Sequence, residues 1–225
     1  YPDAQCVEFC NNDKAACKFQ GPILDDWADD TFEFRYPDGH EDISDFKIMH
    51  DWVVSTYQDG ATGDELAEIY IGEDDTTYTH DTAEYRLAKF KKEFTEHFDF
   101  EFMLIYYLYT FVILMVDQRA KNMFLTTWDK KHWQAWLYDN DTCLGINNVG
   151  ELVFDYDTDG TKYVYNGAES ALWVNFREAF ADEIQVLYEE WRKHQGNADD
   201  LVSYASVNSL LSYKNVIDYL ITRQS

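Results

Sequence analysis

Residues 100–145 contain three different patterns in succession, in the sequence FEFMLIYYLYTFVILMVDQRAKNMFLTTWDKKHWQAWLYDNDTCLG, and together these patterns indicate the fold. Residues 102–116 are consecutive positions without a charged side chain. A helix of that length spans about 22 Å, less than the roughly 30 Å hydrocarbon core of a bilayer. We therefore predict a buried core helix over 100–116 that does not span a membrane.

Two short apolar segments come next, KNMFLTTW at 121–128 and HWQAWLYD at 132–139. Their length and their aromatic and β-branched residues predict two strands, joined by a turn at 129–131. For the tryptophans Trp133 and Trp136, core packing is the default interpretation. The alternative is that these two rings form the wall of a cleft.

Polar residues stand at both ends of this predicted hairpin. Asp117 and Asn122 follow the helix, and Asp139 and Asp141 follow the second strand. Because a hairpin leaves and returns, we expect these four side chains to gather around a common cavity. Their oxygens are hard ligands that suit Mg²⁺, and phosphoryl transfer needs mainly positioning and charge neutralisation. The alternative is that Asp117 caps a helix end and that Asp139 and Asp141 are ordinary residues of a surface turn.

The segments VDQRAKNMFL and WLYDNDTCLG, placed after an apolar helix and on either side of the hairpin turn, resemble the CotH family of kinase-like proteins, which is named for a spore-coat protein. The resemblance implies an atypical protein-kinase fold with Mg²⁺ and ATP as cofactors. It gives Asp117 the role of the catalytic-loop aspartate and Asn122 that of the amide that binds metal and nucleotide. Asp139 takes the place of the metal-binding aspartate of the Asp-Phe-Gly motif, with Asp141 as an added metal ligand.

This resemblance is best over about 98–150 and looser over 168–192. The spelling YDNDTCLGINNVG also resembles segments of large structural proteins of tailed bacteriophages. Two functions follow as expectations. The first is a CotH-like domain fragment, catalytically degenerate, with a structural role among other protein subunits, as in a phage virion tail. The second is an active Mg-ATP-dependent protein kinase. The expected location is the virion or the host cytoplasm, or alternatively the extracellular space or a spore coat.

The chain also departs from the pattern of a working kinase. A kinase needs a lobe that covers the nucleotide and a lysine that pairs with its phosphates. The sequence contains neither GxGxxG nor GxxxxGK[ST]. Lys14 and Lys18 are both candidates for the phosphate-pairing lysine, and Lys121 is either a phosphate contact or a surface residue. Because the chain starts at Tyr1 without Met, we expect a fragment or a processed product whose missing lobe precedes it.

Composition limits the partners. The 225 residues include 43 Asp and Glu against 18 Lys and Arg, for a formal net charge of −25. Such a surface repels the phosphates of nucleic acid, which excludes groove or backbone binding as a function. It suits cations, basic partners or simple solubility. The content of hydrophobic residues, 46%, is enough for a sizeable core.

The predicted fold class is α+β and mainly α, similar to the C-terminal lobe of a protein kinase with small β-hairpins. Residues 1–40 are predicted to form short strands at CVEFC and ACKFQ and then an irregular acidic stretch over 24–39 with a Pro-Asp-Gly turn. This region would be a remnant of the nucleotide lobe or a linker. Residues 41–225 would form the mainly helical lobe.

Apolar residues at helical spacing predict further helices at 42–58 and 83–97. One long amphipathic helix is predicted over 167–196, with Gly196 as its stop signal, and a last helical region over 207–223.

The segment DYDTDG contains Asp155, Asp157 and Asp159 at the first three ligand positions of a calcium loop. Because Asn166 stands where that loop needs a bidentate Glu, we favour a turn within a hairpin over 152–166 and keep a weak Ca²⁺ site as the alternative.

The cysteines lack the spacing of a zinc site, so we expect free buried thiols, or a disulfide if the protein is extracellular. They are Cys6, Cys10, Cys17 and Cys143.

Overall fold

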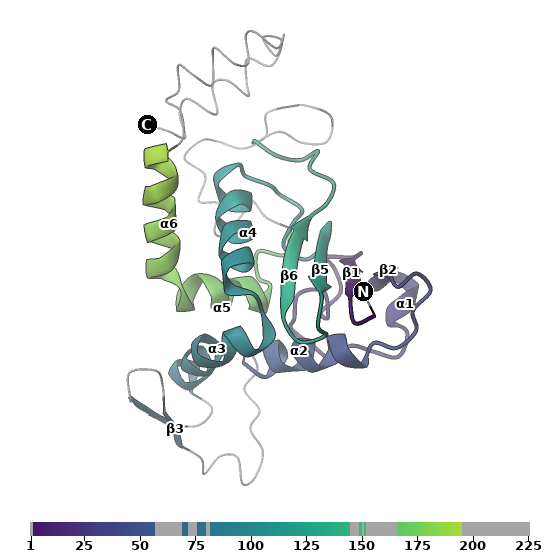
Figure 1. Ribbon diagram of the computed structural model, residues 1–225, viewed down its shortest axis with the longest axis horizontal. Helices are drawn as coiled ribbons and strands as arrows, with labels where there is room; N and C mark the ends of the chain where they lie inside the picture. Colours follow the sequence, from purple (N-terminus) through teal and green to yellow (C-terminus); the bar gives the residue numbers. More distant parts are fainter. Residues whose placement is uncertain are drawn as a thin grey trace.

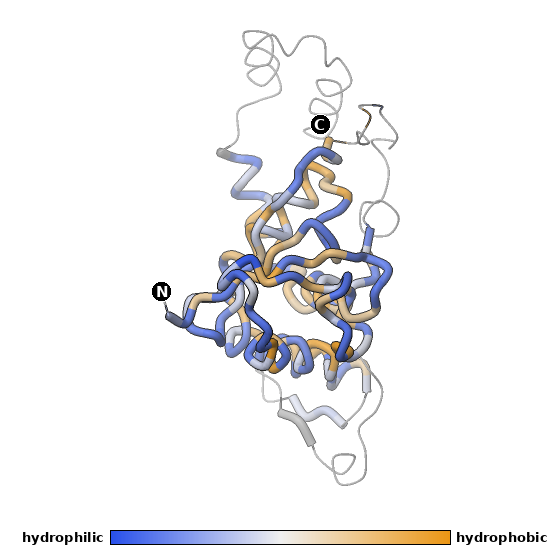
Figure 2. The backbone as a smooth tube through the Cα atoms, turned by 90° about the vertical axis from the view of Figure 1, so that its right-hand side faces the viewer, coloured by the Kyte–Doolittle hydropathy of each residue, from blue (hydrophilic) through white to orange (hydrophobic). Residues whose placement is uncertain are grey.

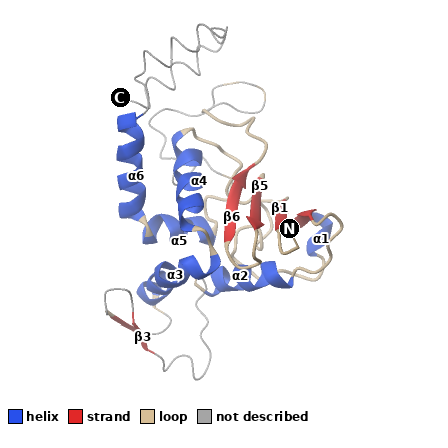
Figure 3. Ribbon diagram, viewed as in Figure 1, coloured by secondary structure: helices blue, strands red, loops and turns tan. Residues whose placement is uncertain are grey.

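The computed structural model describes residues 2–56, 69–71, 76–79, 82–144, 149, 151 and 166–194. These residues form helices packed around a small antiparallel sheet, so the fold class is α+β (Figures 1 and 3). The strands are β1 (Gln5–Phe9), β2 (Phe32–Tyr36), β3 (Ile69–Ile71), β4 (Thr77–Thr79), β5 (Met123–Thr127) and β6 (Trp133–Leu137). The helices are α1 (Trp27–Asp30), α2 (Ser44–Ser55), α3 (Ala83–His97), α4 (Phe100–Val112), α5 (Ala171–Ala179) and α6 (Ala181–His194).

The main sheet has the strand order β2-β1-β5-β6, and every neighbouring pair is antiparallel. β3 and β4 form a separate two-stranded ladder. The two central strands therefore come from distant parts of the sequence, β1 from the N-terminus and β5 from the segment after α4. The sheet spans the predicted domain boundary at residue 40, and that boundary itself stays a prediction.

One face of the sheet packs on α2. Phe46 on this helix contacts Phe9 of β1 and Trp133 of β6, with ring centroids 5.9 and 5.3 Å apart. All three side chains are fully buried. Figure 2 shows hydrophobic segments of the backbone in the middle of the molecule. Burial of these large rings supplies much of the hydrophobic stabilisation of the sheet.

A second part of the core consists of phenylalanines between α3 and α5. Phe94 is fully buried, and its ring lies within 5.4 Å of four others: Phe90, Phe98, Phe176 and Phe180. Leu87, Phe90 and Phe94 of α3 follow one another at spacings of three and four residues, so they lie on one face of the helix.

Several predicted elements are confirmed. α3 has the predicted bounds, and its first turn is capped by Thr82, whose hydroxyl accepts a hydrogen bond from the Tyr85 amide at 3.1 Å. α2 lies within the predicted helix 42–58, and β5 and β6 lie within the two predicted strands. Among the described helices, none is long and apolar enough to cross a bilayer.

The predicted helix 100–116 is wrong at its end, since α4 stops at Val112. It is also less buried than predicted, because Phe102, Ile105 and Tyr109 are 40–59% exposed. The predicted single helix over 167–196 is wrong as well. It is two helices, and the break falls at Phe180, whose ring inserts into the phenylalanine core. Figure 1 shows the chain turning sharply there.

The N-terminal region also differs from the prediction. ACKFQ is a turn rather than a strand, because the amides of Phe19 and Gln20 donate back to Ala16 and Ala15. The stretch 24–39 is not irregular throughout, since it contains α1 and β2. In β2, Phe32 and Phe34 are buried and Glu33 is exposed, which is the alternation of a strand. The many acidic residues around it make this short alternation difficult to recognise in the sequence.

The predicted hairpin over 152–166, the calcium ligands Asp155, Asp157 and Asp159, Gly196 and the helical region 207–223 lie outside the described residues, apart from Asn166. All four cysteines are free thiols, and Cys17 alone is fully buried. Burial raises the pKa of the Cys17 thiol to about 12, which keeps it neutral.

Candidate functional site

The candidate site begins where α4 ends. Leu114 has a positive φ of 52°, and this turns the chain out of the helix. The amides of Leu114 and Met115 donate to the carbonyls of Phe111 and Thr110 at 3.2 and 2.9 Å, which is the Schellman pattern of helix termination. Glycine usually occupies the left-handed position, because it adopts that conformation without steric cost. Here a buried leucine does so.

Backbone hydrogen bonds join residues 113–116, which precede Asp117, to the segment after β6 and to Asn166. The Val116 amide donates to the Thr142 carbonyl at 3.0 Å, and the Leu144 amide donates to the Ile113 carbonyl at 2.6 Å. From the other direction, the Asn166 amide donates to the Val116 carbonyl at 2.9 Å. The chain at 113–116 therefore lies between the segment after β6 and the segment before α5.

Gln118 makes the matching connection on the other side of Asp117. Its side chain is fully buried, and its Nε2 donates to the carbonyls of Tyr138 and Asp139 at 3.1 and 2.8 Å. Its own carbonyl accepts a hydrogen bond from the Tyr106 hydroxyl at 2.8 Å. Because Val116 is bonded to Thr142 and Gln118 to Asp139, the backbone at Asp117 runs beside the segment that contains Asp139 and Asp141.

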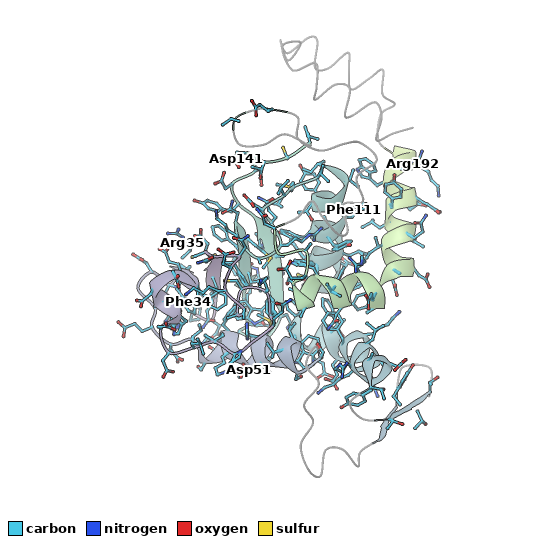
Figure 4. All side chains as sticks on the ribbon, turned by 180° about the vertical axis from the view of Figure 1, so that it is seen from behind. Phe34, Arg35, Asp51, Phe111, Asp141 and Arg192 are labelled. Atoms are coloured by element: carbon cyan, nitrogen blue, oxygen red, sulfur yellow. The ribbon has the colours of Figure 1, made fainter. Side chains whose placement is uncertain are left out.

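Asn122 reaches the same place through the hairpin. It directly precedes β5, and the first residue of β5, Met123, pairs with Leu137 of β6. Asn122 is therefore adjacent to the segment that begins at Tyr138. Its side chain is buried, 9% exposed, whereas Asp139 and Asp141 are exposed. Figure 4 shows Asp141 at the end of the molecule that also holds Phe111, at the end of α4, far from Asp51.

Unusual backbone conformations concentrate in this region. Six non-glycine residues of the described chain have a positive φ, and four of them lie here: Leu114, Asn122, Asp139 and Leu144. Asn and Asp tolerate the left-handed region, but each such leucine costs on the order of 1–2 kcal/mol. Positive-φ residues of this kind persist where the surrounding structure determines them strongly, and they are enriched at functional sites.

Asp117 already has a partner within the chain. The Asn166 side-chain amide donates to its Oδ1. Asn166 is followed by Gly167, which has a φ of +75° and lies against Ala120 so closely that an added Cβ would be 2.5 Å from the Ala120 Cβ. The loop 117–122 is therefore packed directly on the turn before α5.

Two acceptor oxygens in the region suit a hard cation. Among the described residues, neither the buried Gln118 Oε1 nor the buried Thr142 Oγ1 has a hydrogen-bond partner. A buried acceptor without a donor is costly, and a bound cation or water would satisfy it. Carboxylate and amide oxygens are ligands that Mg²⁺ prefers, and the segments of Asn122, Asp139 and Asp141 adjoin those of Gln118 and Thr142. Within the described ranges, no group of three or more His, Cys, Asp or Glu side chains could by itself hold a metal ion.

The candidate lysines differ in their positions. Lys18 forms an ion pair with Glu169 at 3.0 Å, and its carbonyl accepts a hydrogen bond from the Ala171 amide at 2.8 Å. Lys18 therefore lies at the same turn as Asn166. Lys14 pairs instead with Asp30 of α1 at 2.7 Å. Lys121 lies half-buried within the loop.

Sequence reasoning missed Gln118 and Asn166 as site residues. Gln118 stands inside a quoted motif, but nothing in its surroundings indicates a buried amide that binds the segment after β6. Asn166 was considered only as the last position of a calcium loop. Its contact with Asp117 depends on a separation of 49 residues, which no local pattern reports.

Comparison with known proteins does not place the chain in a family. No protein-family model matches the sequence, and no curated protein matches it.

Proposed function

We propose that this chain is a CotH-like domain fragment with a structural role in a larger protein assembly, such as a phage virion tail, and that its catalytic site is degenerate. The observation that carries the assembly role is an apolar stripe on the outer face of α4. Phe102, Ile105 and Tyr109 are 40%, 59% and 47% exposed. Their spacing of three and four residues places them on one face of the helix.

This stripe continues onto the sheet. The rings of Phe102 and Trp136 of β6 lie 5.4 Å apart, and Trp136 is 45% exposed. Single exposed apolar side chains are ordinary, whereas contiguous patches favour an interface with another protein. With a net charge of −25, the chain would attract a subunit whose facing surface is basic.

Contacts of the site residues support loss of catalysis. The resemblance gives Asp117 the task of accepting the proton of a substrate hydroxyl, but its Oδ1 is bonded to the Asn166 amide. Lys18 and Lys14, the candidates for pairing with phosphate, are bonded to Glu169 and Asp30. Each of these contacts would have to break before the residue could serve a nucleotide.

The second candidate is an active Mg-ATP-dependent kinase. It is favoured by the hydrogen bonds that bring the segments of Asp117 and Asp139 together, and by the unsatisfied Gln118 and Thr142 oxygens. Under this kinase hypothesis, Asn122, Asp139 and Asp141 would hold Mg²⁺, which neutralises phosphate charge when it is bound. Asp117 would orient the acceptor hydroxyl.

Two measurements separate these functions. Under the assembly proposal, Ile105→Lys prevents incorporation into the assembly purified from its native source, while Ile48→Lys does not. Ile48 is the matched control because it is similarly exposed, at 65%, but lies on α2. Asp139→Ala should leave incorporation intact. The proposal fails if Ile105→Lys assembles normally.

The kinase hypothesis predicts that Mg-ATP raises the unfolding temperature and that the terminal phosphate is transferred. Asp117→Asn should reduce both effects. A free monomer that labels itself or a partner from ATP would replace the assembly proposal with the kinase hypothesis.

A further inference from the structure

The outer face of the main sheet, opposite α2, carries a cavity of about 410 Å³. This volume lies within the range of small-molecule sites, roughly 300–1,000 Å³. The cavity lies over the end of the sheet where β1 begins and β5 ends, away from the candidate site at the other end of the hairpin. A ligand site in this cavity would be independent of the proposed function.

The register of the strands explains the hollow. Cys6 of β1 pairs with Thr126 of β5, so two small side chains lie next to each other on the outer face of the central strands. Three aromatic residues surround them: Tyr36 of β2, Trp128 just after β5, and Trp136 of β6. The small side chains of Cys6 and Thr126 therefore form the floor of the cavity, and the three aromatic residues form its walls.

A β-bulge places the first of these rings. Val7 pairs with Phe34, but Cys6 pairs with Tyr36, so Arg35 is an extra residue in β2. Without this bulge, Tyr36 would alternate with Arg35 and point to the core face. In the structure both Arg35 and Tyr36 are exposed, and Tyr36 lines the cavity.

All three rings are partly exposed. Tyr36, Trp128 and Trp136 are 46%, 57% and 45% exposed, although aromatic rings of this size are usually buried. The contact of Trp136 with Phe102 supports it from the side facing α4.

The polar groups of the floor are few. The buried Thr126 Oγ1 has no hydrogen-bond partner among the described residues, so it is available to a ligand. Burial raises the pKa of Cys6 to about 11, so its thiol is neutral. No charged residue of the described chain lines the cavity. The nearby Arg35 guanidinium is bonded to Glu8 and Glu33, which offset its charge.

We propose that this cavity binds a small cation whose charge is covered by alkyl groups, namely a methylated ammonium. Aromatic faces attract such a cation through their quadrupole and also cover its methyl groups. The charge of −25 on the chain draws cations toward the surface. A bare metal ion would need oxygen ligands that these rings do not offer.

Other ligand classes fit the cavity less well. An anion would meet no cationic side chain among the lining residues and would be repelled by the whole molecule. A sugar needs a hydrogen bond for most of its hydroxyls, and two of the polar lining side chains, Gln5 and Thr127, already bond to Asp45 and Asp129. A quaternary ammonium group has no N–H that would be left without an acceptor in an apolar cavity.

The test is calorimetric titration of the full chain with choline and with its uncharged tert-butyl isostere, 3,3-dimethylbutan-1-ol, at constant ionic strength. We expect saturable binding of choline and binding of the isostere at least about five-fold weaker, because only choline gains the cation–π attraction. Trp128→Ala and Trp136→Ala should each weaken choline binding by roughly 3- to 30-fold, whereas Tyr36→Phe, which keeps the ring, should stay within about two-fold.

Tyr109→Ala is the control, since this exposed ring lies outside the cavity, and it should bind choline as the wild type does. Circular dichroism checks the fold of each variant, and Trp136→Leu, which also removes the ring, replaces Trp136→Ala if the latter unfolds. A trimethyllysine peptide in a parallel titration tells whether the group comes from a free molecule or from a protein. Four results would each overturn the proposal. They are the absence of saturable binding of either ligand, equal binding of choline and its isostere, unchanged choline binding in both Trp variants, and tighter binding of a methyl glucoside than of choline.

Discussion

The phenylalanine core and the candidate site are built in opposite ways. The core around Phe94 joins regular helices through apolar side chains that recur at helical spacing. The candidate site joins irregular segments, 113–122 and 138–144, through backbone hydrogen bonds, one buried amide and residues in left-handed conformations. Packing energy therefore stabilises the first region, whereas single contacts and single backbone angles stabilise the second.

The largest effect should come from emptying the core. Phe94→Ala removes a fully buried ring that lies within 5.4 Å of four other aromatic rings, and it should cost about 3–5 kcal/mol of unfolding free energy. Chemical denaturation measures this loss. Phe102→Ala, on the exposed stripe, should cost less than about 1 kcal/mol. Equal costs for the two substitutions would contradict the assignment of the core.

The candidate site should instead depend on a single close approach. Gly167→Ala places a methyl group against Ala120 at a positive φ and should cost roughly 2–4 kcal/mol. Gly39→Ala is the matched control: its φ is +68°, but an added Cβ would meet nothing within 4 Å, so only the strain of about 1 kcal/mol remains. Thermal unfolding of both variants separates contact from strain. A Gly167→Ala protein as stable as Gly39→Ala would show that the loop does not pack on this turn.

A polar side chain inside the core gives a pH test. His50 is fully buried against Phe19, and its Nε2–H donates to the Ala16 carbonyl at 2.9 Å. Burial lowers the pKa of His50 from 6.5 to about 4. The unfolded chain therefore binds a proton at higher pH than the folded chain, so this stabilisation is complete above pH 6.5 and is lost as the pH falls toward 4.

Denaturation of the wild type between pH 7 and 5 should show a decline of roughly 1–2 kcal/mol that is smaller in His50→Gln, which has no titrating group. His97, whose pKa burial also lowers, contributes equally in both proteins. The difference between them therefore isolates His50. An identical decline in both proteins would mean that the ring is not held neutral in the core.

The smallest effect sharpens the contrast within the candidate site. Asp139 has a φ of +52°, so Asp139→Gly should leave stability unchanged or raise it by roughly 0.5–1 kcal/mol. Asp141 has no such conformation, and Asp141→Gly should lower stability by a similar amount through the flexibility of the unfolded chain. If both glycines destabilise the protein alike, the left-handed conformation of Asp139 is not a source of strain.

The sequence reveals the elements whose signals are local. The bounds of α3 follow from its periodicity and from the Thr82 cap, and the hairpin of β5 and β6 follows from two apolar runs around a polar turn. The end of α4 could not be predicted because a leucine stands where glycine is the usual signal. The break at Phe180 has no Gly or Pro to mark it, since the position is determined by packing of the ring in the core.

The candidate site shows the same division. The order of helix, Asp117, Asn122, hairpin and Asp139 suggests that the chain returns to its starting point, and the strand register agrees with this expectation. The hydrogen bonds that hold the site depend on Gln118 and Asn166, whose partners are distant in sequence. Whether the site binds Mg²⁺ and ATP stays a prediction.

The most direct test of the gathered site is a nuclear Overhauser spectrum of the isotope-labelled chain. We expect cross-peaks between the Gln118 side-chain amide and the α-protons of Tyr138 and Asp139, and between the Val116 amide proton and the residues around Thr142. If these cross-peaks are absent while those across β5 and β6 are present, the segments do not meet and the account of the site is wrong.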